Sequence, residues 1–424
     1  MPAVIALTLL AGCSSGALGP IAGARLEGSR PSSQAARVSV IHSFSGAPLS
    51  STPEAGLIAD GSGNLYGTAV YGGTPSKVPC DSGCGAAFEL SPQKGGTWNE
   101  TVLYSFKNSE TGLYPSNPLI LDAAGNLYGT TPVGGSQGVA YELVHRAGEW
   151  HYKVLHIFMG CRDGQQPESG LTEFNGNLYG TTVAGGNSCS GGNGTVFEFS
   201  HVGGRWKYAI IYRFRSYSDG MSPQAGLTYD SSGNLYGTTA YGGNSNCGSG
   251  CGMVFELSRS RTGRWSEKVL HQFSKTDGAL PDADLVWGPS GELYGSTNQG
   301  ANSGCPNGCG TIFTLTRGKR NNWRYSIVHA FIEQQGGGPA GNMVFDESGN
   351  LYGSTVIGGS GGDGVLFELA PAGGKWTYTV LHDFTSSPDG AEPNGVVMAG
   401  RGKFFGTTIG GGDYSMGSAF EVEK

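Results

Sequence analysis

The stretch Asp60-Gly61-Ser62-Gly63-Asn64-Leu65-Tyr66-Gly67 recurs along the chain in near-copies, and this recurrence decides the fold. The pentapeptide Gly-Asn-Leu-Tyr-Gly occurs five times, and the stretches 291–295 and 402–406 are close variants of it. A repeat of this kind indicates one supersecondary unit that is stacked or arranged in a ring. One aromatic residue marks each copy, at intervals of about 56 residues: Tyr66, Tyr128, Tyr179, Tyr236, Tyr294, Tyr352 and Phe405.

Each copy has the pattern of four short strands. The first strand follows a proline and runs over a stretch such as 55–60, and a turn such as 60–63 leads to the second strand, 64–68. Aspartate and glycine suit that tight turn. A Gly-Gly pair and a variable loop precede the third strand, as at 194–199, and the fourth begins at tryptophan in six copies. The prolines are Pro53, Pro115, Pro167, Pro223, Pro281, Pro339 and Pro393.

Strand signals at short intervals, with no helical periodicity, indicate an all-β protein. Four antiparallel strands in each of seven repeats predict a seven-bladed β-propeller over residues 38–424. Residues 38–44 match a fourth strand with no blade before them, and residues 418–423 match a third strand with nothing after it. We therefore expect the N-terminal strand to join the last blade, which closes the ring and removes an open sheet edge.

The repeat unit Val-Leu-His-x-Phe, Asp-x-x-Gly-Asn-Leu-Tyr-Gly-Thr-Thr, Gly-Gly and Gly-Thr-Val-Phe-Glu-Leu resembles that of the bacterial "GloVer" choice-of-anchor tandem-repeat family. The likeness covers residues 38–424. It implies an exported, surface-anchored repeat protein with no assigned biochemical activity. More loosely, the unit is similar to the NHL-type propeller repeat.

The composition agrees with a turn-rich β fold. The 424 residues include 76 glycines and 20 prolines, yet also 19 tyrosines, 18 phenylalanines and 7 tryptophans, too many rings for a disordered chain. The formal net charge is −7, and there is no basic cluster such as nucleic-acid binding requires. A nucleic-acid partner is therefore not expected.

The first residues resemble a bacterial lipoprotein signal. Residues 3–10 are apolar but too short to span a membrane, and Leu10-Ala11-Gly12-Cys13 matches a lipobox at all four positions. The resemblance implies a signal peptide over residues 1–12, a lipid on Cys13 and a flexible tether over residues 13–37. No lysine or arginine precedes the apolar core, so secretion after cleavage elsewhere is the alternative.

Eight cysteines remain besides Cys13, and we expect them to form four disulfides in an oxidising envelope. Three Cys-x-x-x-Cys pairs and a Cys161–Cys189 bridge would all lie in loops on one face of the ring. The alternative is a zinc site formed by two of the pairs, which their spacing allows. The three pairs are Cys80/Cys84, Cys247/Cys251 and Cys305/Cys309.

Other polar residues that attract attention follow the repeat. Five histidines share one repeat position with two tyrosines, so we expect a packing role for that position. The paired threonines after Tyr-Gly could line the channel or serve as strand residues. Four Asp-Gly loops could contact a sugar or a cation, although turn capping also explains them: Asp163, Asp219, Asp277 and Asp389.

No catalytic motif stands out, and no metal or cofactor is expected. The sequence predicts a monomeric, envelope-anchored, non-enzymatic binding or scaffolding protein, held at the membrane only by its lipid. Its disulfide-bearing loop face would contact a carbohydrate or protein ligand. The alternatives are a carbohydrate-active hydrolase or lyase with carboxylates near the channel mouth, and a structural envelope protein without a soluble ligand.

Overall fold

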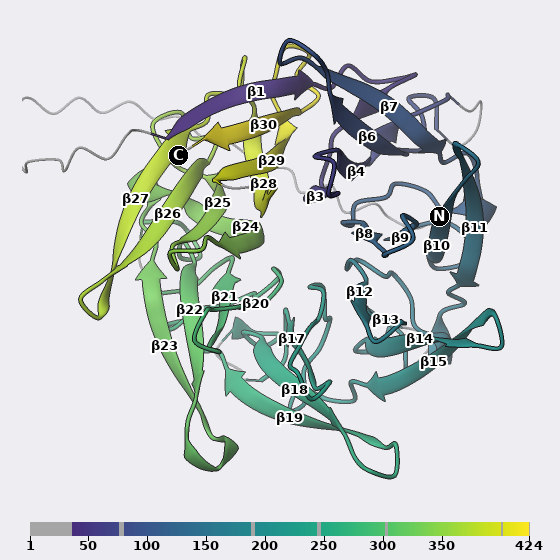
Figure 1. Cartoon of the computed structure of the whole chain (residues 1–424). Coiled ribbons are helices and arrows are strands. Elements are labelled where there is room, and N and C mark those ends of the chain that lie inside the picture. Colours follow the sequence, from purple (N-terminus) through teal and green to yellow (C-terminus); the bar gives the residue numbers. More distant parts are fainter. Residues whose placement is uncertain are drawn as a thin grey trace, which may run out of the picture. The chain divides into compact units, whose positions relative to one another are not determined.

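A computed structural model describes residues 36–75, 80–187, 191–243, 247–301, 304–399 and 402–423. The unit over Ala36–Lys424 is a ring of seven four-stranded antiparallel sheets, which confirms the predicted seven-bladed β-propeller (Figure 1). The proposed lipidation site, Cys13, and the expected disulfide partner Cys189 lie outside the described residues. Among the described residues, no helix is long and apolar enough to cross a bilayer.

Each of blades 1 to 4 runs from a short inner strand to a long outer strand. Blade 1 consists of β3 (Ile58–Ala59), β4 (Leu65–Ala69), β6 (Ala86–Pro92) and β7 (Trp98–Ser105). Blade 2 consists of β8 (Ile120–Leu121), β9 (Leu127–Thr131), β10 (Val139–Arg146) and β11 (Glu149–Ile157). Blade 3 consists of β12 (Thr172–Phe174), β13 (Asn177–Thr182), β14 (Thr195–Val202) and β15 (Arg205–Arg213). Blade 4 consists of β16 (Thr228–Tyr229), β17 (Leu235–Thr239), β18 (Met253–Arg259) and β19 (Trp265–Gln272).

Blades 5 to 7 complete the ring. Blade 5 consists of β20 (Val286–Trp287), β21 (Leu293–Thr297), β22 (Thr311–Arg317) and β23 (Trp323–Ala330). Blade 6 consists of β24 (Gly337–Phe345), β25 (Leu351–Ile357), β26 (Val365–Ala372) and β27 (Lys375–Asp383). Blade 7 consists of β28 (Ala391–Met398), β29 (Lys403–Gly410), β30 (Ser418–Glu423) and the N-terminal β1 (Arg37–Ser43). The described residues also include the pair β2 (Ser50–Ser51) and β5 (Tyr71–Gly72) and the 3₁₀ turns η1 (Ser109–Thr111), η2 (Cys161–Asp163), η4 (Lys319–Asn321) and η5 (Glu333–Gln335).

The ring closes as predicted. Strand β1 pairs antiparallel with β30, so the outer strand of blade 7 comes from the N-terminal end of the propeller. Figure 1 shows β1 lying outside β30, β29 and β28. This pairing gives the outer edge of β30 a hydrogen-bonding partner.

The polar residues of the repeated motif are used within the turn itself. Asp60 Oδ1 accepts hydrogen bonds from the backbone N–H groups of Ser62 (2.8 Å) and Asn64 (2.9 Å). Its Oδ2 accepts from Asn64 Nδ2 (2.9 Å) and from the Tyr66 hydroxyl (3.2 Å). The same set of bonds is formed around Asp122, Asp230 and Asp346. This motif therefore builds a hairpin and leaves little capacity for a ligand.

The glycine after the motif tyrosine makes room for an aromatic ring. A Cβ on Gly180 would lie 2.5 Å from a ring carbon of Phe197, and the other blades repeat this contact. Buried residues in the described part of the chain form seven hydrophobic clusters, and these clusters span neighbouring blades. One of them joins Tyr128 and Phe158 of blade 2 to Leu178 and Phe199 of blade 3. The core is thus a series of seams between blades.

The repeated histidines pack in these seams. His156 stacks on Tyr208 of the next blade with ring centroids 3.9 Å apart, and Tyr104 stacks in the same way on Tyr152 at 4.2 Å. The predicted packing role of this position is therefore confirmed. Two seams differ, because blades 1 and 4 have Glu100 and Glu267 where four other blades have tyrosine. His42 Nε2 lies 2.8 Å from Glu100 Oε2.

Candidate functional site in the central channel

The backbone turns sharply where each blade begins. The residue before each proline has a left-handed backbone conformation, with φ between 54° and 59°. For residues other than glycine this conformation is uncommon and costs free energy. The seven residues are Thr52, Tyr114, Gln166, Ser222, Leu280, Gly338 and Glu392.

Each of these turns is held by the preceding blade. The Leu280 N–H donates to the carbonyl of Cys251 (3.0 Å), and the Tyr114 N–H donates to the carbonyl of Cys84 (2.9 Å). The equivalent bond is formed in every blade, to a residue of the loop between the second and third strands. The residues just after the prolines therefore lie at the end of the channel that carries these loops.

In blades 1 to 5 this geometry makes the inner strands shorter than predicted, whereas β24 and β28 of blades 6 and 7 span nine and eight residues. A strand over 55–60 was expected, but β3 spans only Ile58–Ala59. Residues 54–56 leave the ladder and line the axis instead, as their counterparts do in other blades. The cavity that they surround has a volume of about 150 Å³. Its lining residues are Glu54, Ala55, Gly56, Ser116, Asn117, Pro118, Glu168, Ser169, Gly170, Gln224, Ala225, Gly226, Asp282, Ala283, Asp284, Gly341, Asn342 and Asn394.

The paired threonines support this lining and do not form it. Thr130 Oγ1 donates to the carbonyl of Ser169 (2.8 Å) in the next blade, and Thr181 Oγ1 donates to the carbonyl of Ala225 (3.1 Å). Both threonines are buried. The second member of a pair bonds locally, as Thr182 Oγ1 does to the carbonyl of Ala184 (3.0 Å).

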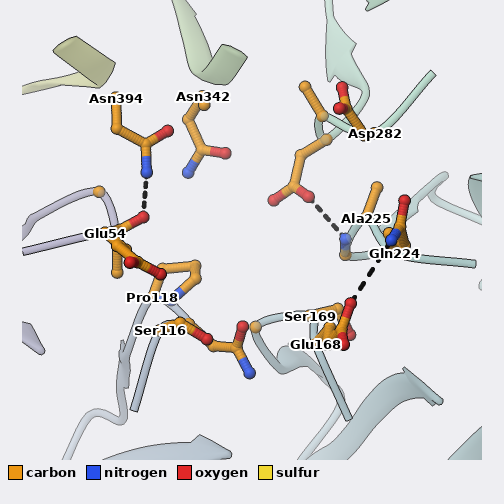
Figure 2. Close-up of a pocket in the computed structure, with 18 residues that line it drawn as sticks. Glu54, Ser116, Pro118, Glu168, Ser169, Gln224, Ala225, Asp282, Asn342 and Asn394 are labelled. Carbon is orange, nitrogen blue, oxygen red and sulfur yellow. Dashed lines mark hydrogen bonds between the residues drawn. The ribbon is translucent and has the colours of Figure 1, made fainter. Parts of the chain in front are cut away.

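The residue directly after the proline differs from blade to blade, whereas most other motif positions repeat. Figure 2 shows side chains of this position, together with Asn342, arranged around one opening. The backbone supplies the same frame seven times, and the side chains make the site asymmetric. In chain order the seven residues are Glu54, Ser116, Glu168, Gln224, Asp282, Ala340 and Asn394.

Blade 5 also departs from the repeat two residues after Asp282. Asp284 occupies a position that is glycine in blades 1, 3 and 4, and its Oδ1 accepts a hydrogen bond from the Gly226 N–H (2.6 Å). A Cβ on Gly226 would lie 3.0 Å from both carboxylate oxygens of Asp284. The glycine of blade 4 thus makes room for the aspartate of blade 5.

Further polar contacts link neighbouring blades at the opening. Gln224 Nε2 donates to Glu168 Oε2 (3.4 Å), and Asn394 Nδ2 donates to the carbonyl of Glu54 (Figure 2). Asp282 differs, because its Oδ1 is buried and has no hydrogen-bond partner among the described residues. A buried carboxyl oxygen without a partner is costly and invites a donor from a ligand.

The channel is acidic, and its carboxyl groups are hard to ionise. Burial raises the pKa of Asp282 to about 7. Burial also raises the pKa values of Glu168, Asp284 and Glu54, and at Glu54 the carboxylate of Glu392 adds to the effect. None of the described residues that line the cavity is a lysine, arginine or histidine. The opening therefore offers carboxyl and amide groups as donors and acceptors with no fixed positive charge.

The four aspartates predicted to bind a ligand lie in separate loops and have internal partners. Asp163 Oδ2 lies 3.0 Å from His156 Nε2, and Asp219 Oδ2 accepts from the Tyr212 hydroxyl at 3.0 Å. Asp277 and Asp389 have the corresponding contacts with the histidines of their own blades. The structure distributes these carboxylates around the ring, so a ligand role for them stays a prediction.

The three Cys-x-x-x-Cys pairs are disulfides within their own loops. Cys161 is disulfide-bonded as well, while Cys189 lies outside the described residues. The three pairs therefore do not supply thiolates for the alternative zinc site. Among the described residues, no group of three or more histidine, cysteine or acidic side chains is placed to hold a metal ion.

The disulfides hold the blade junctions. Cys84, Cys251 and Cys309 are buried, and their carbonyls accept the N–H groups of the strained turns of the next blade. Disulfides persist in oxidising compartments. The three bridges therefore indicate a protein that matures outside the cytoplasm.

Sequence reasoning missed the channel residues. The repeat is defined by its shared positions, so residues that vary between copies carry no signal in it. Placing the seven residues after the prolines in one column would have shown three acidic and two amide side chains at one place in the ring. Sequence reasoning also misses Asp284, although it replaces a glycine that blades 1, 3 and 4 share at that position.

The comparisons with known proteins agree with this architecture. The model of the Gloeobacter/Verrucomicrobia repeat matches residues 30–249, 136–305 and 301–424. A search of curated proteins gave no significant match.

Solved structures show the same fold at low identity. The extracellular domain of a candidate one-component system from B. thetaiotaomicron has a TM-score of 0.54 and 10% identity, and the alignment covers 91% of this chain and 40% of that one. A candidate 6-phosphogluconolactonase from Bacteroides uniformis has a TM-score of 0.50 and 13% identity, with 76% and 84% covered. These likenesses concern the fold alone.

Proposed function

The chain belongs to the Gloeobacter/Verrucomicrobia repeat family, and from that premise we propose that it is an exported carbohydrate-binding propeller whose central channel receives a sugar ring. One observation carries the proposal. The position after the proline is where six of the seven blades present polar side chains, of five different kinds, to a single cavity. Positions that repeat build the ring, whereas differing side chains that converge on its axis can recognise an asymmetric ligand.

The size and chemistry of the channel fit a monosaccharide. An engineered cavity of about 150 Å³ holds benzene, so a cavity of this volume can receive part of a sugar ring, whose hydroxyls then lie at the opening. Sugar hydroxyls both donate and accept hydrogen bonds. Amide groups and carboxyl groups of raised pKa, such as those of Gln224, Asn342 and Asp282, also do both.

Binding is tested by a glycan microarray, followed by calorimetric titration of the sugar that gives the strongest signal. Asp282→Asn and Glu168→Gln are expected to weaken binding about tenfold or more, since each changes a group at the opening. Glu267→Gln is the matched control, because Glu267 lies on the outer strand β19 and burial likewise raises its pKa to about 7. Equal affinities for all four proteins would refute a channel site.

The loop aspartates provide the competing location for the ligand. If the disulfide-bearing loop face binds the sugar, Asp163→Asn or Asp389→Asn will reduce affinity and the channel variants will not. We expect the reverse, because both loop carboxylates already have histidine partners at 3.0 and 2.7 Å.

A hydrolase is the second candidate, and the pKa of Asp282 favours it. A carboxyl group whose pKa is about 7 is protonated to a large extent at neutral pH, as a general acid must be. Release of reducing sugar from a polysaccharide panel, abolished by Asp282→Asn, would establish catalysis. Binding without turnover would support the binding role.

Anchoring through Cys13 is part of the proposal. The lipobox match at Leu10–Cys13 supports a lipoprotein, and the disulfides support export. Labelled palmitate should be incorporated into the native chain and lost in Cys13→Ala. Equal labelling of both proteins, or of neither, would contradict the lipid anchor.

A further inference from the structure

A tryptophan begins the outer strand of six blades and lies at the seam with the preceding blade. Each indole packs against the motif aromatic of that blade; Trp206, for example, meets Tyr128 edge to face with centroids 5.8 Å apart. These seams lie at the strand ends that carry the turns between first and second strands. In antiparallel blades those ends form the face opposite the disulfide loops.

In three seams a second side chain of the same blade covers the indole. His145 stacks on Trp150 at 4.6 Å and an interplanar angle of 23°. The guanidinium carbons of Arg259 and Arg317 lie 5.7 and 5.4 Å from the ring centroids of their tryptophans, Trp265 and Trp323. In all three blades, the covering residue is the direct cross-strand neighbour of the tryptophan.

Three seams lack such a cover, and two of them contain cavities; in the third, the cross-strand neighbour of Trp376 is Pro371. His201 is the cross-strand neighbour of Trp206 and meets it edge to face, at 66°, and Pro92 is the neighbour of Trp98. The groove at Trp206, between blades 2 and 3, has a volume of about 710 Å³. The groove at Trp98, between blades 7 and 1, has a volume of about 520 Å³. Both volumes fall within the usual range for ligand pockets, roughly 300–1,000 Å³.

The two grooves share a construction. Each places a lysine–glutamate pair of the preceding blade beside the aromatic rings: Lys153 Nζ lies 2.8 Å from Glu142 Oε2 in one, and Lys403 pairs with Glu421 in the other. The turn of the following blade forms the opposite wall. In the blade 2–3 groove this wall includes the exposed Asn175.

We propose that these two grooves are carbohydrate-binding sites in which a pyranose ring lies against Trp206 or Trp98. The C–H face of a pyranose is apolar and suits an indole face, and its equatorial hydroxyls reach outward. Ammonium, carboxylate and amide groups around the tryptophans can bond these hydroxyls. The ligand would take the place that imidazole or guanidinium groups fill in the other seams. The grooves share no lining residue with the channel, so the proposal does not depend on it.

The test places a covering side chain over Trp206 and Trp98, the tryptophans of the two grooves. His201→Arg and Pro92→Arg place arginine at the position held by Arg259 and Arg317, while both tryptophans stay in place. The ligands for calorimetric titration are cellohexaose, xylohexaose and chitohexaose, since each presents a chain of flat pyranose faces. Thermal unfolding monitored by circular dichroism checks that each variant is folded.

At least one oligosaccharide should bind the native protein. Each single variant should lose one of the two groove sites, and the double variant should bind about tenfold more weakly or worse. Asp282→Asn, which alters only the channel, should leave the groove sites unchanged. The proposal is overturned if none of the three oligosaccharides binds, or if the folded double variant binds as the native protein does. Loss of all binding in Asp282→Asn alone would assign the sugar to the channel and likewise overturn the groove proposal.

Discussion

Replacing Asp282 by asparagine is expected to stabilise the protein, and only at neutral and alkaline pH. Asp282 Oδ1 is buried without a partner among the described residues, and burial raises the pKa of the carboxyl to about 7, from 3.8 in an exposed setting. Below pH 4 the group is protonated in both the folded and the unfolded chain. Between pH 4 and 7 the unfolded chain loses this proton first, so the free energy of unfolding falls as pH rises.

The largest expected change in the free energy of unfolding follows from the interval between the pKa values of the unfolded and the folded chain. A separation of about three pH units, at about 1.4 kcal/mol per unit, amounts to ~4 kcal/mol as an upper limit above pH 7. Asparagine resembles the protonated aspartate in shape and never ionises. Asp282→Asn should therefore equal the native protein in stability at pH 4 and exceed it by as much as ~4 kcal/mol at pH 8.

Urea unfolding, followed by tryptophan fluorescence at pH 4 and pH 8, measures this difference. Asp60→Asn is the control of opposite sign, because hydrogen bonds from Asn64, Ser62 and Tyr66 outweigh desolvation and lower the pKa of Asp60. That variant should be less stable than the native protein at pH 8, and the deficit should shrink as pH falls through the range in which Asp60 is protonated. If the stability of Asp282→Asn relative to native did not change between the two pH values, the reasoning about the channel would be refuted.

Three further predictions concern stability elsewhere. Gly180→Ala should lower the free energy of unfolding in urea by about 1–3 kcal/mol, because its Cβ would lie 2.5 Å from the Phe197 ring. Gly61→Ala, whose Cβ would have no atom within 4 Å, should be nearly neutral. Equal effects of the two substitutions would contradict the packing argument. Replacing Cys247 and Cys251 together by serine should lower the free energy of unfolding by about 2 kcal/mol under oxidising conditions and leave the stability measured under reducing conditions nearly unchanged. Glu267→Gln should raise the free energy of unfolding at pH 8 and not at pH 4. Burial raises the pKa of Glu267 to about 7, and its Oε1 has no partner among the described residues. A gain of the same size at both pH values would contradict this prediction.

The fold could be predicted from the repeat because its shared residues act locally. Aspartate, asparagine and tyrosine of the motif bond to one another within a single hairpin, so the pattern specifies the turn without reference to other blades. Ring closure was predictable for a similar reason, since residues 38–44 carry the pattern of an outer strand. The inner strands of blades 1 to 5 are shorter than predicted, because residues that follow the strained turns line the axis. The position of the axis depends on the whole ring.

The candidate site could not be predicted in the same way. Glu54, Glu168 and Asp282 are more than 50 residues apart from one another, and only closure of the ring brings them to one cavity. A method that looks for repeated residues discards them, because they differ between copies. The loop aspartates stand out in the sequence for the opposite reason, because they recur. Their recurrence accompanies a structural contact with a histidine or tyrosine.

The most direct measurement for the central claim is a crystal structure of the protein soaked with the sugar that binds most tightly in the array. A sugar ring bound in the channel, within hydrogen-bonding distance of Asp282 and of amide groups such as Gln224, is the result expected. A channel that contains only water, in crystals whose sugar occupies the loop face or the tryptophan grooves alone, would contradict the assignment of the channel as the principal binding site.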